Sequence, residues 1–460
     1  MLPWIIPVGF GLLSLAFIVG NWFTLWDAWR AAHKEGARSY SLTPVAGGLF
    51  GALGLLAAPE PALKVWFWLP LLIDPGGLWY LGMAMLAMRR ERQETAARAQ
   101  ALLLGDDAVR RSRALEGSLL GTAVGDALGL ACEGLSPARQ RTLFPELDQY
   151  GFLFGYGLCS DDTEHAVMLA QSLIVSGGDA AHLQRDFAWR LKGWLIGLPA
   201  GVGLATLRAI VKLCLFIPPR WSGVRSAGNG PAMRAAVLGV AWGDDPAHLR
   251  VLNQIAAGIT HRDVRAEEGA LTVALAAHLA ASRAHPVSPQ QWLQEVSHIL
   301  DANGQTLAAI RLAVACVERG EPVRTLLDQI GSRNGVSGFM LHTVPAVVHV
   351  WLRHQDDFEA GIEEIIRLGG DTDTSAAILG GIIGARVGKE GIPPVLLARL
   401  IDWPRSTAYL SHVARRLAES RALGKPMKEI RLFLPAIWPR NLIFMIVVLL
   451  HGFRRLLPPY

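Results

Sequence analysis

The chain has 460 residues, of which 51% are hydrophobic and 18% charged, and its formal net charge is +5 at pH 7. This length has room for one large catalytic domain and a further unit, while the small net charge argues against a nucleic-acid partner. The four cysteines are scattered and lack CxxC or zinc-ligand spacing, which argues against a disulfide framework and suits a reducing compartment.

The first 88 residues are predicted to be a membrane region with three transmembrane segments, at 2–26, 41–59 and 65–88. The first segment contains no charged residue and is long enough to cross a bilayer. Because no basic stretch precedes it, a secretory signal peptide is the weaker interpretation. The third segment is interrupted by Asp74-Pro-Gly-Gly, which is turn chemistry and predicts a broken or re-entrant helix.

Basic residues set the predicted orientation of this region. They follow the first and third segments, at Arg30, Lys34, Arg38, Arg89, Arg90 and Arg92. The positive-inside rule then places everything after residue 89 in the cytosol. We therefore expect a multi-pass protein of a bacterial inner membrane with a cytosolic catalytic domain. Residues 89–112 are predicted to form a basic linker helix that lies on anionic headgroups.

The part after the linker is predicted to be all-α, with a catalytic domain over residues 113–420, because strand signals are scarce and Ala-rich apolar runs dominate. Its first helix carries glycines at intervals of four residues, at Gly117, Gly121, Gly125 and Gly129. On a helix these align in a groove that another helix backbone can approach. The uncharged run is too short to span a membrane, so we expect close packing within a soluble domain. Asp126 and Glu133 are the only charges there, and Glu133 closes the run.

Two stretches far apart in the sequence share one pattern, in which hydroxyls and paired carboxylates lie directly ahead of an apolar helix. They are Ser-Asp-Asp-Thr at 160–163 and Asp-Thr-Asp-Thr at 371–374, the second after a Gly pair. Ordinary N-capping is one explanation. Buried carboxylates, however, need a compensating positive charge, and a helix N-terminus supplies only part of it. Two such starts facing each other would offer the hard oxygen ligands that Mg²⁺, Mn²⁺ or Ca²⁺ prefer.

Two further loops carry candidate ligand contacts. Ser226-Ala-Gly-Asn-Gly-Pro opens an apolar helix, where backbone amides can hold a phosphate, although the GK[ST] ending of a P-loop is absent. Thr260-His261 precedes another Ala-rich helix, and His261 either contacts a ligand or caps that helix.

The C-terminal tail, residues 421–460, is apolar and basic. Ten uncharged and mainly apolar residues follow Pro439-Arg440, which are too few for a comfortable span, and crossing would leave Arg454 and Arg455 outside. The tail is therefore predicted to be interfacial or docked on the membrane region.

Together these motifs resemble the ADP-ribosylglycohydrolase family over residues 113–420. The matching motifs, in the family's order, are GSLLGTAVGDALGLACE, SDDTEHA, SAGNGPAMR, the Thr-His pair and GGDTDTSAA. The resemblance implies an all-α, orthogonally packed multi-helix domain with two Mg²⁺ or Mn²⁺ ions in a cleft. The metal ligands that it implies are Ser160, Asp161, Asp162, Asp371, Asp373 and Thr374, and Ser160 stands where the family usually has Thr.

The resemblance also implies a substrate site. Gly228, Asn229 and Gly230 would hold the ADP-ribose phosphates, His261 would contact the nucleoside, and the catalytic candidates are Glu133, Asp162 and Asp371. The implied reaction is hydrolysis of a glycosidic bond at the anomeric carbon of ribose. The expected partners are a lipid bilayer and an ADP-ribosylated protein or small-molecule ADP-ribose conjugate, the linkage being open. Two alternatives remain, a non-catalytic ADP-ribose-binding membrane sensor and another two-metal hydrolase.

Overall fold

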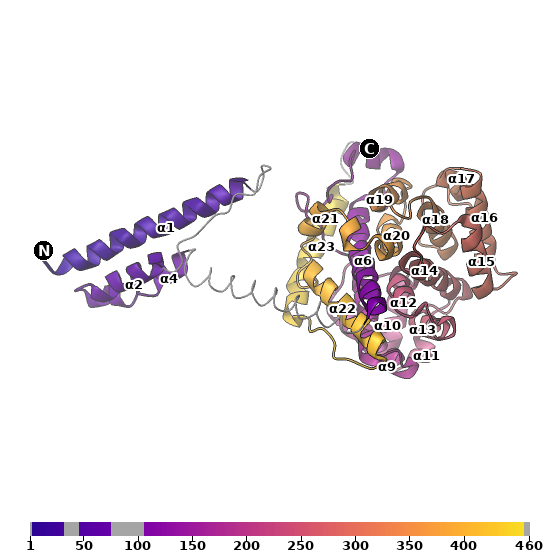
Figure 1. Cartoon of the computed structure of the whole chain (residues 1–460), viewed down its shortest axis with the longest axis horizontal. Coiled ribbons are helices and arrows are strands. Elements are labelled where there is room, and N and C mark those ends of the chain that lie inside the picture. The colour runs from indigo at the N-terminus through magenta and orange to yellow at the C-terminus, as the bar shows by residue number, and fades with distance from the viewer. Residues whose placement is uncertain (1, 32–45, 75–104, 455–460) are drawn as a thin grey trace. The chain divides into compact units, whose positions relative to one another are not determined.

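The computed structural model describes residues 2–31, 46–74 and 105–454, and the chain divides into two compact units at about residue 100 (Figure 1). The described residues form α-helices and short 3₁₀ helices, with isolated β-bridges and no sheet. The predicted all-α class is therefore confirmed for the part of the chain that the structure describes.

The first unit is built on a long apolar helix. Its helices are α1 (Ile5–Ala31), α2 (Ala46–Ala57), α3 (Pro61–Lys64) and α4 (Leu69–Ile73). Polar groups point inward: the Asp74 carboxylate accepts hydrogen bonds from Asn21 Nδ2 at 2.9 Å and from the Gly48 amide at 2.8 Å. As far as Phe23, the large exposed side chains of α1 are apolar, and Ile5 and Phe23 are more than half exposed.

The predicted count of three transmembrane segments is wrong for the described residues. By length and composition, two helices there could cross a membrane, Ile5–Thr24 and Leu434–Arg454, and the second lies at the other end of the chain. In the predicted segment 41–59, residues 41–45 lie outside the described ranges, and the described part forms the 12-residue α2, which ends just before Pro59. The segment 65–88 begins with turns and the five-residue α4, and its residues after Asp74 lie outside the described ranges.

Two glycine-rich helices form the centre of the second unit, α6 (Asp106–Gly129) and α20 (Thr372–Val387) (Figure 1). A Cβ added to the α6 glycines would lie 2.0, 2.1, 2.2 and 2.3 Å from carbonyl oxygens of α20. The pairs are Gly117 with Gly384, Gly121 with Gly380, Gly125 with Ala376, and Gly129 with Thr372. The expected close packing within the domain is therefore confirmed.

The remaining helices surround this pair. They are α7 (Pro137–Leu143), α8 (Asp161–Ser176), α9 (Ala180–Ile196), α10 (Leu204–Cys214), α11 (Pro219–Ser222), α12 (Ala235–Trp242), α13 (Pro246–Gly258), α14 (Val264–Ser282), α15 (Pro289–Ile299), α16 (Gln305–Glu318), α17 (Val323–Gln329), α18 (Met340–Arg353), α19 (Phe358–Arg367), α21 (Pro394–Arg399), α22 (Thr407–Leu423) and α23 (Ile437–Arg454). Helices α8, α12 and α22 all contact α6, and α12 also packs on the buried α14. The predicted linker 89–112 overlaps α6 from Asp106 onward, and its residues 89–104 lie outside the described ranges.

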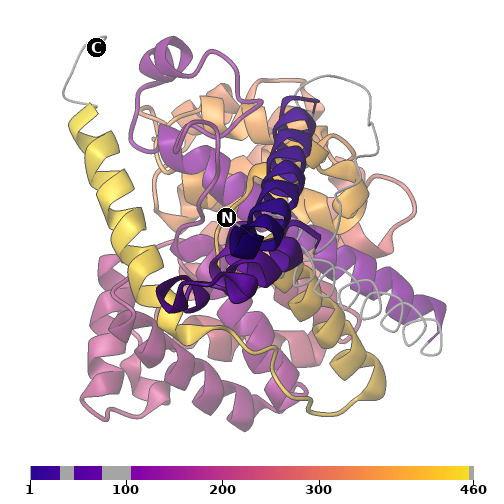
Figure 2. The ribbon, with the colours of Figure 1, turned by 90° about the vertical axis from the view of Figure 1, so that its left-hand side faces the viewer.

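The C-terminal helix α23 runs along the outside of the second unit, as both views show (Figure 2). It is longer than the ten apolar residues counted in the sequence, because the helix continues through Arg440 at one end and His451 at the other. Phe444 packs into a small apolar cluster with Leu130, Phe152 and Leu158. In the tail, residues Ile437–Arg454 therefore form a helix docked on the domain.

Candidate active site

Helix α8 begins at the first acidic stretch. Ser160 is its N-cap, and the Ser160 hydroxyl accepts a hydrogen bond from the Asp162 amide at 3.3 Å. Ser160 and Asp162 are almost fully buried. Ser160 therefore caps the helix, as one of the two sequence-based explanations predicted. This role is compatible with the metal-ligand explanation, because the Asp162 carboxylate beside it lies inside the domain.

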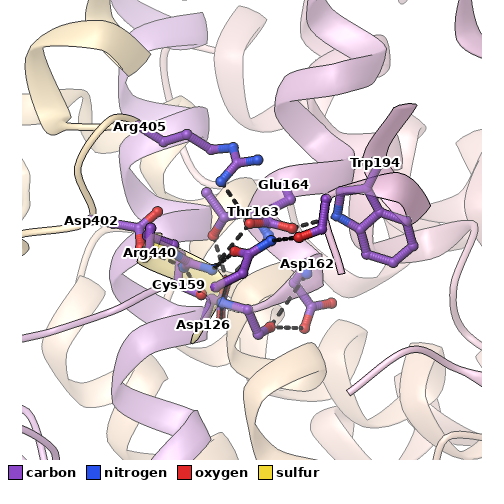
Figure 3. Close-up of polar contacts among 12 residues, drawn as sticks. Asp126, Cys159, Asp162, Thr163, Glu164, Trp194, Asp402, Arg405 and Arg440 are labelled. Carbon is purple, nitrogen blue, oxygen red and sulfur yellow. Dashed lines mark hydrogen bonds and ion pairs between the residues drawn. The ribbon is translucent and has the colours of Figure 1, made fainter. Parts of the chain in front are cut away.

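Asp126 of α6 holds this helix start in place. Its carboxylate accepts hydrogen bonds from the Ser160 amide at 2.9 and 3.0 Å, the Thr163 amide at 3.1 Å and the Thr163 hydroxyl at 2.5 Å (Figure 3). Burial raises the pKa of Asp126 to about 6, although these hydrogen bonds oppose the shift. The sequence marked Asp126 only as a charge in an apolar run. Nothing in that run indicated which helix N-terminus the Asp126 carboxylate would stabilise.

The second acidic start follows a sharp turn. Gly369 and Gly370 have φ values of +77° and +88°, which favour glycine. The Asp371 amide then donates to the Val336 carbonyl at 2.7 Å, and the Thr372 hydroxyl donates to the Gly129 carbonyl at 2.7 Å. The close approach of α6 and α20 thus brings the start of α20 to the end of α6.

The two acidic starts meet at Asp162. The Thr374 hydroxyl of α20 donates to Asp162 Oδ2 at 3.2 Å, and the Ser160 hydroxyl donates to the same oxygen at 3.2 Å. The other oxygen, Asp162 Oδ1, is buried and has no hydrogen-bond partner among the described residues. A buried carboxylate oxygen in this condition needs a ligand to offset its desolvation.

Burial and mutual repulsion together determine the electrostatics of this acidic cluster. Burial, followed by neighbouring carboxylates, raises the pKa of Asp161, Asp162 and Asp373 well above the ordinary value. The neighbours that act on Asp373 include Glu133 and Asp371. Glu133 itself is exposed, and its loop is fixed because the Gly134 amide donates to the Gly370 carbonyl at 2.8 Å.

The donor chemistry fits a divalent cation of the Mg²⁺ or Mn²⁺ type. Repelling carboxylates, two hydroxyls and the unbonded Asp162 Oδ1 are hard oxygen donors. Within the described ranges, no group of three or more His, Cys, Asp or Glu side chains is gathered closely enough to hold an ion. The site therefore has oxygen donors suitable for a divalent cation, but these side chains do not converge on a single position.

The glycine-rich loop lies beside the second acidic start. Asn229 Nδ2 donates to Asp371 Oδ2 at 2.8 Å, and the Asn229 amide donates to the Gly338 carbonyl at 3.0 Å. The ring of His261 packs against Gly228 and Gly230, where added Cβ atoms would lie 3.2 and 3.0 Å from it. Burial and the nearby Arg234 lower the pKa of His261 to about 3, so its ring is neutral. The structure thus brings residues 228–230, His261 and Asp371 together.

A further loop was missed in the sequence. A Cβ added to Gly338 would lie 3.2 Å from Asp371 Oδ2, so this residue lines the acidic site. The Thr343 hydroxyl lies 3.1 Å from Asn229 Nδ2 and donates to the Ser337 carbonyl at 2.8 Å. The glycine ahead of an apolar helix was visible, but nothing local indicated which loop it would face.

A buried charged cluster lies behind the first acidic start (Figure 3). Glu164 Oε1 forms ion pairs with Arg405 at 2.7 Å and with Arg440 at 3.2 Å, and Glu164 Oε2 accepts a hydrogen bond from Trp194. Arg440 also bonds to Asp402 and to the Cys159 carbonyl. The sequence did not indicate this cluster, because its members come from four separate segments.

This fold and site define an all-helical hydrolase whose carboxylates gather at the starts of two helices beside a glycine-rich loop. A family model described as ADP-ribosylglycohydrolase matches residues 106–426, and the chain belongs to that family. It is accordingly a glycosidic hydrolase of the ADP-ribosylglycohydrolase type, as the sequence motifs predicted.

The relatives match this chain over most of their own length. A protein of Archaeoglobus fulgidus with no described function is 33% identical over 65% of this chain and 94% of its own length. Chicken ADP-ribosylhydrolase ARH3 is 28% identical, over 63% of this chain and 90% of its own. ADP-ribosyl-[dinitrogen reductase] glycohydrolase of Rhodospirillum rubrum is 28% identical, over 62% and 89%. A solved ADP-ribosylglycohydrolase-related protein complex has a TM-score of 0.52, with 28% identity, 68% coverage of this chain and 99% of its own.

Proposed function

We propose that this protein removes ADP-ribose from a modified protein or a small-molecule conjugate by hydrolysing the glycosidic bond at the anomeric carbon, in a metal-dependent reaction and at a membrane. The observation that carries the proposal is the meeting of two acidic helix starts at Asp162, through the Thr374 hydroxyl at 3.2 Å. Two relatives whose names describe ADP-ribosyl hydrolysis match 63% and 62% of this chain.

Two Mg²⁺ or Mn²⁺ ions would be held by the six residues of these starts, Ser160, Asp161, Asp162, Asp371, Asp373 and Thr374. Bound there, they would supply Lewis-acid chemistry and orient the ribose hydroxyls. The hydrogen bonds of Asp126 keep the first start in position, and those of Asn229 and Thr372 keep the second. Hydrogen bonds of this kind hold metal-binding side chains in position before the ions bind.

Glu133 is our candidate general base. Its side chain is exposed at the edge of the acidic cluster, close enough to raise the pKa of Asp373. A carboxylate in this position can accept a proton from a water that attacks the anomeric carbon. The small residues Gly228 and Gly230 leave room for phosphates to approach the backbone, and Asn229 orients that loop towards Asp371.

The membrane part of the proposal depends on α1. Its residues Ile5–Thr24, 20 in number, have sufficient hydropathy to cross a bilayer, and the polar Ser14 and Asn21 are turned inward. Apolar residues outside and satisfied polar groups inside are the distribution expected in lipid. We propose that this unit anchors the enzyme, and resistance of the full chain to alkaline extraction from membranes would support it.

The activity is tested with the full chain in detergent or nanodiscs. ADP-ribose release is measured from an arginine-ADP-ribosylated protein and from a serine-ADP-ribosylated peptide, with Mg²⁺ or Mn²⁺ and with EDTA. We expect release from one of the two substrates, lost with EDTA, which names the linkage. Tight, metal-dependent ADP-ribose binding without release would replace this proposal with the sensor function.

A further inference from the structure

Helix α23 has the inverse of the usual distribution of polar and apolar side chains. Its buried stripe, which faces the domain, consists of Ile437, Arg440, Asn441 and Phe444. Its outward side chains are large and apolar, at Trp438, Leu442, Ile443, Met445, Ile446, Leu449, Leu450 and Phe453. Several of these are more than 60% exposed, and Leu450 is 64% exposed. A helix that packs on a domain and faces water normally has its charges outside and its apolar residues inside.

The inward polar side chains are fully engaged with the domain. Arg440 is paired with Asp402 and Glu164, and Asn441 Nδ2 donates to the Gly197 carbonyl at 2.6 Å. The ring of His451 lies 4.7 Å from that of Phe152. These contacts fix which face of α23 points outward. The apolar exterior is therefore a property of the docked helix, not of a loosely placed tail.

Exposed apolar residues continue beyond the helix. Trp438 Nε1 donates to the Ile196 carbonyl at 3.2 Å, and Ile196 and Leu198 are 65% and 68% exposed. Just before α23, the rings of Phe433 and Trp403 lie 5.9 Å apart, and both are more than half exposed. We call the outer side of α23 with these four residues the apolar face. A group of this many exposed large apolar side chains marks an interaction site.

We propose that the apolar face lies in the lipid of a bilayer surface, with α23 parallel to the membrane plane. The inference rests on the proposed membrane attachment. Helix α1 of the same chain is suited to cross a bilayer, and this would keep the second unit near the membrane surface. A protein partner normally meets a rim of polar side chains and forms hydrogen bonds across the interface. The outward residues of α23 offer almost none, since only Arg454 at its end is charged.

The position of Arg440 favours an interfacial helix over a crossing one. Although α23 is long and apolar enough to cross, its crossing would separate Arg440 from Asp402 and Glu164, which are buried in the domain. A helix that lies in the interface instead buries its apolar side among the acyl chains and leaves its inward contacts intact. Trp438 at one end and Arg454 at the other suit the headgroup region.

The test places a probe on the apolar face. In a Cys214→Ser background, since the other three cysteines are buried, Leu450→Cys carries an environment-sensitive fluorophore in the full chain. The protein is reconstituted into phosphatidylcholine and phosphatidylglycerol vesicles that contain nitroxide lipids labelled near the headgroup or near the chain end. The matched control is Val251→Cys, another exposed apolar position, on α13. A second probe site on the same face, Leu442→Cys, covers the case in which Leu450→Cys fails to fold.

We expect blue-shifted emission at Leu450→Cys and at least twofold stronger quenching by the headgroup-proximal nitroxide than by the chain-end nitroxide, with the control unaffected. Stronger quenching by the chain-end nitroxide would mean that α23 crosses, and overturns the proposal. Absence of quenching would mean that another part of the chain or a second copy covers the face, and also overturns it. ADP-ribose release from the same vesicles reports the proposed function separately.

Discussion

The Nη1 atom of Arg440 lies 3.2 Å from Oε1 of Glu164, and both side chains are almost completely buried. Glu164 directly follows the first acidic start, whereas Arg440 belongs to a helix beyond the residues that the family model matches. This ion pair connects the C-terminal helix α23 to the first turn of α8, which carries the first acidic start. Arg440 also donates a hydrogen bond to the Cys159 carbonyl, which strengthens this connection because Cys159 directly precedes the capping Ser160.

Replacing Arg440 with Met should destabilise the second unit by about 3–5 kcal/mol, because it removes one partner of a buried ion pair. Hydrogen exchange of the α8 and α23 amides in increasing denaturant measures the loss. The exposed Arg431→Met is the control, with an expected change of about 0.5 kcal/mol or less. Arg440→Lys should recover only part of the loss, since an ammonium cannot reproduce the planar set of bonds. Equal stabilities for Arg440→Met and the control would contradict the role of the cluster.

Gly121→Ala should separate α6 from α20. The new Cβ would lie 2.1 Å from the Gly380 carbonyl oxygen, so the two backbones must move apart. Overpacking of this kind costs about 3 kcal/mol. Gly193→Ala on α9 is the matched control, because nothing lies within 4 Å of its added Cβ and removing a helix glycine stabilises by about 0.5–1 kcal/mol. The unfolding temperature should therefore fall for Gly121→Ala and rise for Gly193→Ala. A fall or a rise in both variants would contradict the close packing of α6 on α20.

Asp162→Asn should reduce metal-dependent ADP-ribose release by at least about a hundredfold while leaving the fold intact. Asparagine preserves the size of the side chain and removes one of several repelling carboxylates, so stability without metal should not fall. A second measurement is independent of activity. Mn²⁺ should raise the unfolding temperature of the unsubstituted protein, and this shift should be lost in Asp162→Asn. A variant that keeps both activity and the Mn²⁺ shift would remove Asp162 from the site.

Glu133→Gln should lower kcat far more than it weakens ADP-ribose binding. The amide cannot accept a proton from water, while the exposed position leaves the fold and the phosphate loop unchanged. Calorimetric titration with ADP-ribose and steady-state release kinetics separate the two effects. Equal losses in binding and turnover would assign Glu133 a binding role instead of a catalytic one.

Asp126→Asn tests whether the N-terminus of α8 depends on the hydrogen bonds that it donates to the Asp126 carboxylate. The amide oxygen can still accept hydrogen bonds, but the negative charge at the N-terminus of α8 is lost. We expect a loss of about 1–2 kcal/mol in unfolding free energy. Hydrogen exchange at the first turn of α8 should increase more than exchange at the first turn of α9, which Asp179 caps independently. Uniform exchange at both helix starts would contradict this positioning role.

The sequence by itself determined the features that depend on neighbouring residues. Helix starts at Ser160 and Asp371, the four-residue glycine interval of α6 and the all-α class follow from local chemistry, because capping, turn geometry and helical periodicity act over a few residues. The motifs also indicated the family, which the comparisons then showed.

Only the tertiary structure decided the contacts between distant segments. Asp126 at the start of α8, Gly338 beside Asp371, and Arg440 paired with Glu164 have no local signature, since each depends on which helices the core brings together. Among the described residues, the structure also decided which helices are long enough to cross a membrane. Hydropathy counts apolar residues along the chain, whereas the length of α23 and the shortness of α2 depend on where each helix begins and ends.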